Sequence, residues 1–117
     1  MSDADPACLF CKIVGREVPT DIVHESDRTV AFRDVNPQAP THVLVIPRRH
    51  EPDLAALVEA DADDVVAIGK AVADIALSEG LGEGYRVVFN TGAKASQSVF
   101  HCHAHVLGGR ELSWPPG

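Results

Sequence analysis

The sequence predicts an α+β fold in which an antiparallel sheet packs against one long helix. Several short runs rich in β-branched and aromatic residues are separated by turn residues, which is typical of antiparallel strands. One longer stretch that ends near Ser78 has apolar residues at helical spacing. At 117 residues the chain can bury a core but is too short for two domains, so we expect one domain over residues 1–117.

The elements expected before the long helix follow from local patterns. A short helix is predicted near Leu9 to Val14, where apolar residues recur until the turn residue Gly15. The runs DIVHE and TVAFRD, joined by the polar SDR, indicate a hairpin. The segment VNPQAPT is expected to be a loop, because its two prolines lack the N–H that a central strand needs. The apolar run HVLVIP follows as a strand that ends at Pro47.

The long helix is expected to begin at about Asp53 or Asp61 and to end at Ser78. An aspartate can cap its first turn, and the glycine-rich stretch from Gly80 to Gly84 ends it. The apolar run YRVVFN then predicts a strand, and the polar segment TGAKASQS predicts a loop. After the run VFHCHAHVLGG, prolines exclude regular structure from the tail RELSWPPG.

The amino-acid composition argues against several classes of binding partner. The formal net charge of −7 argues against nonspecific binding to the phosphates of nucleic acids, although a local pocket can still bind a small anion. The segment MSDADPA lacks the features of a signal peptide, and no apolar run approaches the roughly 18 residues of a transmembrane helix. Three cysteines do not resemble a disulfide scaffold. We therefore expect a cytoplasmic protein that contacts neither nucleic acid nor membrane.

The stretch FHCHAHVLGG sets His101, His103 and His105 at alternate positions. On a strand, alternate residues share one face, so the three imidazoles would line up roughly 6–7 Å apart. The intervening side chains, Phe100, Cys102, Ala104 and Val106, suit a core. Such a row can ligate a metal, or a neutral imidazole in it can attack phosphorus and form a phosphoramidate intermediate.

The covalent route needs further groups that the sequence supplies. Gln97 and Ser98 precede the histidine row in a polar loop and are placed to contact phosphate oxygens. His42 opens the strand HVLVIP and would approach the row if the two strands share a sheet. Asp34 and Asn36 are candidate sugar ligands, although a loop aspartate on its own is more often a turn former.

Together these residues resemble the histidine triad (HIT) superfamily, whose signature His-x-His-x-His with two following apolar residues is matched by HCHAHVL. The segments FCKIV, AFRDVNPQAPTHVLVIP, GYRVV, QSVFHCHAHVLGGR and WPPG extend the resemblance to the HINT branch over almost the whole chain. The resemblance implies a five-stranded antiparallel sheet with one long helix and a short amino-terminal helix. It also implies a homodimer in which two such sheets join into one, with residues 1–7 flexible and the tail 110–117 contributing to the dimer.

The resemblance implies hydrolysis of purine nucleoside 5′-phosphoramidates, of the AMP–lysine or AMP–amine type. It also implies binding of purine mononucleotides, with AMP, GMP and adenosine as the expected ligands. His103 would be the nucleophile, His105 would hydrogen-bond the phosphate or leaving group, and His42 would share in proton relay. Ser98 and the backbone of Gln97 to Val99 would hold the phosphate. Asn90 would lie near that phosphate. The expected ribose and base contacts are Phe10, Ile13, Val18, Phe32, Asp34, Val35 and Leu44, and Trp114 would reach the partner subunit's site.

A second site is expected at the amino terminus. Cys8-x-x-Cys11 alone is a weak metal signal and is equally typical of a redox pair or of two small core residues. His50 and His101 would complete a Cys₂His₂ tetrahedron, and the resemblance implies that this set holds a structural zinc. His101 would then be a ligand, which leaves His103 free of metal.

One departure and two alternatives stay open. The family commonly has a glycine pair before Gln-Ser, whereas Ala95 and Ser96 stand here, so the phosphate loop keeps its shape only if Ser96 adopts a glycine-like backbone. One alternative function is a metallohydrolase in which His101, His103 and His105 all ligate the ion. The other is a nucleotide-binding regulatory protein with little turnover.

Overall fold

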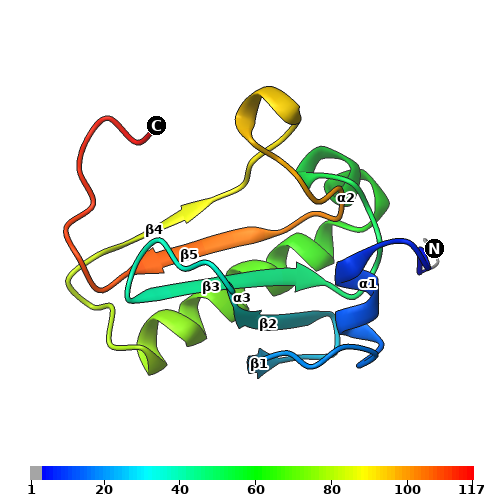
Figure 1. Cartoon of the computed structure of the whole chain (residues 1–117), viewed down its shortest axis with the longest axis horizontal. Helices are drawn as coiled ribbons and strands as arrows, with labels where there is room; N and C mark the ends of the chain where they lie inside the picture. Colours follow the sequence, from blue (N-terminus) through cyan, green and yellow to red (C-terminus); the bar gives the residue numbers. More distant parts are fainter. Residues whose placement is uncertain (1–3) are drawn as a thin grey trace.

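The computed structural model describes residues 4–117 and contains one five-stranded antiparallel sheet (Figure 1). The strands are β1 (Ile22–Glu25), β2 (Thr29–Arg33), β3 (Thr41–Pro47), β4 (Tyr85–Val88) and β5 (Ala104–Gly108), and their order across the sheet is β1-β2-β3-β5-β4. The helices are α1 (Leu9–Val14), α2 (Leu54–Ala60) and α3 (Ala62–Ser78), with a 3₁₀ turn η1 (Ala93–Ala95). The predicted α+β class and five-stranded sheet are confirmed.

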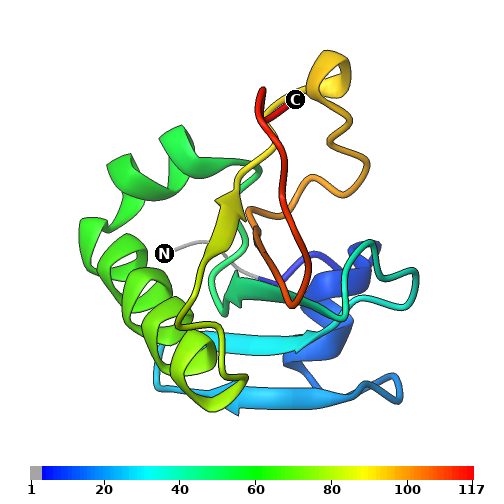
Figure 2. The ribbon, with the colours of Figure 1, turned by 90° about the vertical axis from the view of Figure 1, so that its left-hand side faces the viewer.

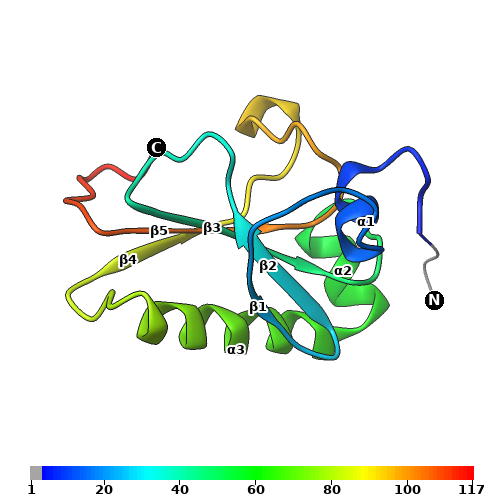
Figure 3. The same cartoon turned by 60° about the horizontal axis from the view of Figure 1, so that its bottom comes forward.

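Strand alternation divides the core into two clusters, one on each face of the sheet. Val43 and Val45 of β3 point towards α3 and pack with residues such as Ile68 and Ile75. Leu44 and Ile46, one position out of phase, pack on the other face with Phe10 and Ile13 of α1. Figure 2 shows α3 and α1 on opposite sides of the sheet. Most of the apolar residues expected to line the base pocket pack on the α1 face. The helix α3 lies on the opposite side of the sheet (Figure 3).

The predicted long helix is two helices. Asp53 caps α2 and Asp61 caps α3, so each of the two expected starting points begins a helix. Asp61 interrupts the helical path because its backbone is extended, with φ −165°. Its carboxylate accepts a hydrogen bond from the Asp63 N–H and forms an ion pair with Arg28, at 2.8 Å from the guanidinium nitrogen.

The histidine row lies only partly on a strand, which corrects the expectation of a continuous strand. β5 begins at Ala104, so His105 is on the strand while His101 and His103 precede it. The strand does not extend further because the Cys102 N–H donates to the carbonyl of Glu51, outside the sheet, at 2.7 Å. The expected core direction holds for Cys102, Ala104 and Val106, whereas the side chain of Phe100 is 52% exposed.

The ends of the described chain are held by hydrogen bonds. Met1 to Asp3 of the segment expected to be flexible lie outside the described residues. Asp5 accepts from the Cys8 N–H with its carbonyl and donates its own N–H to Cys11 Sγ at 3.3 Å. At the other end, Arg86 of β4 donates to the carbonyl of Ser113 at 2.8 Å and holds the tail along the sheet edge. Among residues 4–117 there is no helix with the length and hydropathy needed to span a membrane.

Candidate active site and metal cluster

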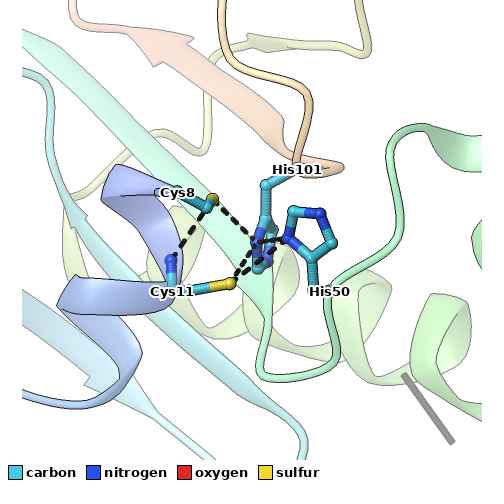
Figure 4. Close-up of side chains that lie close together, drawn as sticks. All are labelled: Cys8, Cys11, His50 and His101. Carbon is cyan, nitrogen blue, oxygen red and sulfur yellow. Dashed lines mark hydrogen bonds between the residues drawn. The ribbon is translucent and has the colours of Figure 1, made fainter. Parts of the chain in front are cut away.

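Four predicted metal ligands converge from three separate segments (Figure 4). Cys8 and Cys11 come from α1 and the residue that caps it, His50 follows β3, and His101 precedes β5. Their donor atoms all lie within 4.8 Å of one another. The Nδ1 atom of His101 is 3.6 Å from each sulfur and 3.1 Å from Nδ1 of His50, and Cys11 Sγ is 3.2 Å from the same His50 nitrogen.

These distances fit one tetrahedral ion. Zinc bond lengths in a tetrahedron place two nitrogens about 3.3 Å apart and a sulfur and a nitrogen about 3.6 Å apart. The His101 Nε2–H donates to the Pro47 carbonyl at 2.8 Å, which leaves Nδ1 unprotonated and aimed into the cluster. Burial lowers the pKa of His101 to about 4, so its ring is neutral at physiological pH. Backbone N–H groups of Cys11 and Asp5 point at the two sulfurs, as suits thiolate ligands.

The hydrogen bonds of His103 assign its tautomer. Its Nδ1–H donates to the carbonyl of His101 at 2.8 Å, so Nε2 carries the lone pair. The edge-to-face contact with Phe10, at 5.1 Å between ring centroids, fixes the plane of the ring. His103 is 8% exposed and lies 5.0 Å from His105, again between centroids. A neutral imidazole with a free Nε2 lone pair is a competent nucleophile.

His42 and His105 form an ordered chain of donors. The Gln38 N–H donates to His42 Nδ1 at 3.0 Å, so the proton of neutral His42 is on Nε2. That Nε2–H points at His105 Nδ1, 2.9 Å away, which places the proton of His105 on Nε2. Burial lowers the pKa of both rings, that of His105 to about 4, and the nearby Asp34 carboxylate only partly opposes this. His105 therefore carries its N–H donor on Nε2, in a ring whose centroid lies 5.0 Å from that of His103.

A second metal-like grouping, Asp34 with His42 and His105, is better explained as part of this chain. Its donor atoms lie within 4.8 Å of one another. To ligate through Nε2, neutral His42 would carry its proton on Nδ1, where the Gln38 N–H already points. Of the donor groupings found in residues 4–117, none contains all of His101, His103 and His105. The geometry therefore disfavours the alternative in which those three histidines ligate one ion.

The loop before the row differs from the expectation at Gln97. Its side chain is 5% exposed and accepts from the Gly92 N–H while donating to the carbonyls of Pro52 and Val99. The Gln97 amide thus holds the loop and is not free for phosphate, which corrects a direct side-chain role. Ser98 is exposed and Asn90 is half-buried. Ser96 adopts φ 67° and ψ 27°, the left-handed conformation that glycine takes most easily.

The predicted base-pocket residues fall into two groups. Most lie in or against the apolar cluster on the α1 face: Phe10, Ile13, Val18, Phe32 and Leu44. Val99, from the segment expected to hold the phosphate, packs against the same cluster. Val35 is fully exposed on the loop after β2, and Trp114 is 83% exposed on the tail, so neither packs against that cluster. Asp34 behaves as the turn former that loop chemistry favours, since its Oδ1 accepts from the Asn36 N–H at 2.8 Å.

Two contributors to the site were not predicted, because they act through backbone groups. The Gln38 N–H sets the tautomer of His42, and the Pro47 carbonyl sets that of His101. Every residue has a backbone carbonyl and nearly every residue a backbone N–H, so the sequence does not indicate that these two groups contribute to the site. A hollow of about 750 Å³ lies between the α3–β4 loop and the start of the tail, and no histidine lines it.

The comparisons with known proteins agree with this geometry. The HIT domain family matches residues 15–112, and the chain therefore belongs to the HIT family. It is 44% identical to a 14 kDa zinc-binding protein of Zea mays, over 97% of this chain and 90% of that protein. It is 40% identical to adenylylsulfatase HINT1 of Arabidopsis thaliana, over 97% and 79%. A HIT family hydrolase from Legionella pneumophila superposes with a TM-score of 0.89 at 45% identity, over 94% of this chain and 99% of that one.

Proposed function

We propose that the chain hydrolyses purine nucleoside 5′-phosphoramidates through a nucleotidyl-histidine intermediate on His103. The observation that carries the proposal is the pair of assigned tautomers: a lone pair on His103 Nε2 and a donor on His105 Nε2. The relatives named as a HIT family hydrolase and as an adenylylsulfatase support a hydrolase activity.

In this proposal His103 Nε2 attacks the α-phosphorus while its Nδ1–H stays bonded to the His101 carbonyl. The phosphorus–nitrogen bond breaks and the amine departs with a proton taken up from solvent. Water then cleaves the nucleotidyl-histidine bond and returns a proton, so His103 is regenerated. His105 Nε2–H donates to the phosphate or leaving nitrogen, and its orientation comes from His42.

The nucleotide would lie against the α1 face. Phe10, Phe32 and Leu44 supply apolar surface for the base and the ribose. The Asp34 carboxylate lies 3.5 Å from His42 Nε2, and in this proposal it accepts hydrogen bonds from the ribose hydroxyls. Ser98 and the backbone from Gln97 to Val99 would contact the phosphate.

Hydrolysis is tested with an adenosine 5′-phosphoramidate whose released amine is fluorescent. The wild-type chain is expected to release the amine, and His103→Ala is expected to lose at least about a thousandfold in kcat/KM. A His103→Ala chain as active as the wild type would contradict the nucleophile assignment. Tight AMP binding by the wild-type chain without turnover would instead favour the regulatory alternative.

We also propose that the Cys₂His₂ cluster holds zinc. The mixed sulfur and nitrogen donors suit zinc, and the maize relative is named for zinc binding. When bound, the ion would tie α1 to the loops that carry His50 and His101. Metal analysis of the purified chain should give about one zinc per chain, and Cys11→Ser should lower that content. A full zinc content in Cys11→Ser would contradict these ligands.

A homodimer through the β4 edge is the third part of the proposal. β4 is the last strand of the sheet, its Tyr85 and Val87 are exposed, and Tyr85 lines the hollow described above. The tail that carries Trp114 is held to the same strand through Arg86, so it can reach a partner across that edge. Light scattering should give twice the chain mass for the wild type and a lower mass for Val87→Lys. A monomeric wild-type chain would contradict the dimer.

A further inference from the structure

We propose that Cys8 and Cys11 form an oxidation-sensitive pair whose conversion to a disulfide by a hydroperoxide dismantles the metal cluster and weakens the support of His103. The inference builds on the proposed function for its effect on turnover. Its chemical and metal-binding parts rest on the cluster alone.

The two thiols are placed to react with each other. Cys8 caps α1 and Cys11 lies in its first turn, with the Cys11 N–H pointing at Cys8 Sγ at 3.4 Å. Their sulfurs lie within 4.8 Å of each other, so a small rotation of the side chains brings them to bonding distance. Both cysteines are free, and Cys8 is only half-buried, which gives an oxidant access to its sulfur.

The third cysteine of the chain is an internal control. Cys102 is 1% exposed and packs in the core beneath α3, on the other face of the sheet. A buried thiol without access to solvent reacts slowly with hydroperoxides. Oxidation is therefore expected at Cys8 and Cys11 and not at Cys102.

The chemistry balances with a hydroperoxide as the oxidant. The Cys8 thiolate attacks one peroxide oxygen, the oxygen–oxygen bond breaks, and an alcohol or water leaves after taking up a proton. The resulting sulfenic acid is attacked by the Cys11 thiolate, which forms the disulfide and expels hydroxide that is protonated to water. Two electrons pass from the two sulfurs to the peroxide.

Disulfide formation removes two of the four donors from the cluster. His50 and His101 would remain as a pair of imidazoles, which is too few ligands for a closed structural site. Metal release is the expected consequence.

His101 and Phe10 connect the cluster to the proposed nucleophile, His103. His101 contributes its ring to the cluster and its carbonyl to the Nδ1–H of His103. Phe10, which lies between the two cysteines in α1, contacts the rings of His101 and His103 at centroid distances of 5.9 and 5.1 Å. Loss of the cluster frees both α1 and the backbone at His101. Cys8, Cys11 and Phe10 are thus positioning residues for His103.

The test treats the zinc-loaded full chain with hydrogen peroxide and follows four quantities. We expect an intact mass lower by two hydrogens with one disulfide between residues 8 and 11, and one equivalent of zinc captured by a chromogenic chelator. We also expect a shift of the His103 ring signals in NMR spectra and a fall of at least about tenfold in kcat. A dithiol reductant with added zinc should restore all four.

Matched variants separate the outcomes. Cys102→Ala should respond like the wild type, whereas Cys8→Ser should form no disulfide. Oxidation of Cys102 in place of the pair, or a disulfide that leaves zinc bound, would overturn the proposal. Zinc release with unchanged His103 signals would overturn the positioning role. A chain that never hydrolyses phosphoramidates but shows the mass change, zinc release and NMR shift would refute the proposed function and leave this inference supported.

Discussion

The Gln97→Ala substitution tests whether the Gln97 side chain stabilises the loop before His101, as its hydrogen bonds indicate, or contacts the phosphate. In the structure the buried Gln97 amide accepts from the Gly92 N–H at 2.8 Å and donates to the carbonyls of Pro52 and Val99 at 2.7 and 3.1 Å. Truncation deletes three hydrogen bonds, each with a net value of about 1 kcal/mol. Because the partner groups are only partly buried, the expected loss in free energy of unfolding is about 2–3 kcal/mol.

The magnitude is measured by urea and thermal unfolding. A loss of that size lowers the thermal midpoint by about 10 °C in a domain of this length. The rate of phosphoramidate hydrolysis should fall as well, because the loop that precedes His101 is no longer held.

Ser98→Ala is the matched control from the same loop. Ser98 is exposed, so its substitution should change the free energy of unfolding by less than about 0.5 kcal/mol while lowering the rate through the lost phosphate contact. If Gln97→Ala unfolds like the wild type, the assignment of its amide as the support of the loop is wrong. If Ser98→Ala turns over at the wild-type rate, the phosphate role of Ser98 is wrong.

Three further predictions concern stability. Ser96→Gly should raise the free energy of unfolding by about 1 kcal/mol in urea titrations, since it relieves a left-handed residue at φ 67°; an unchanged or lower value would contradict that strain. Asp61→Ala should cost about 1–2 kcal/mol by loss of the α3 cap and the Arg28 ion pair, while the exposed Asp63→Ala should cost much less; equal losses would refute this. The pKa of His105, lowered to about 4, lies below its unfolded value, so its contribution to stability is complete above about pH 6.5 and falls as pH approaches 4. An NMR midpoint for His105 near 6.5 would contradict this.

The sequence predicted most elements because their signals are local. The helix Leu9–Val14 and the five strands were found from periodicity, turn residues and prolines. The break at Asp61 was not predicted, because Asp53 and Asp61 were expected as alternative starts of one helix. Two capping aspartates were visible, but the interruption depends on Arg28, which is 33 residues away and becomes a neighbour only in the folded chain.

The candidate site was also predicted in part from the sequence. The convergence of Cys8, Cys11, His50 and His101 followed from residue types and a family resemblance, and the structure brings these four together. The role of Gln97 could not be predicted, because its partner carbonyl belongs to Pro52, 45 residues earlier. The tautomers of the histidines depend on backbone groups, and backbone groups leave no residue-type signal.

The most direct test of the central claim is to trap the covalent intermediate. The chain is mixed with an adenosine phosphoramidate labelled in the phosphate, quenched in alkali within milliseconds, and digested for mass spectrometry. A phosphorus–nitrogen bond on histidine survives alkaline quenching, so the labelled nucleotide should be found on His103, and on no residue in His103→Ala. Rapid turnover by the wild-type chain with no labelled protein, or with the label on another residue, would contradict the account.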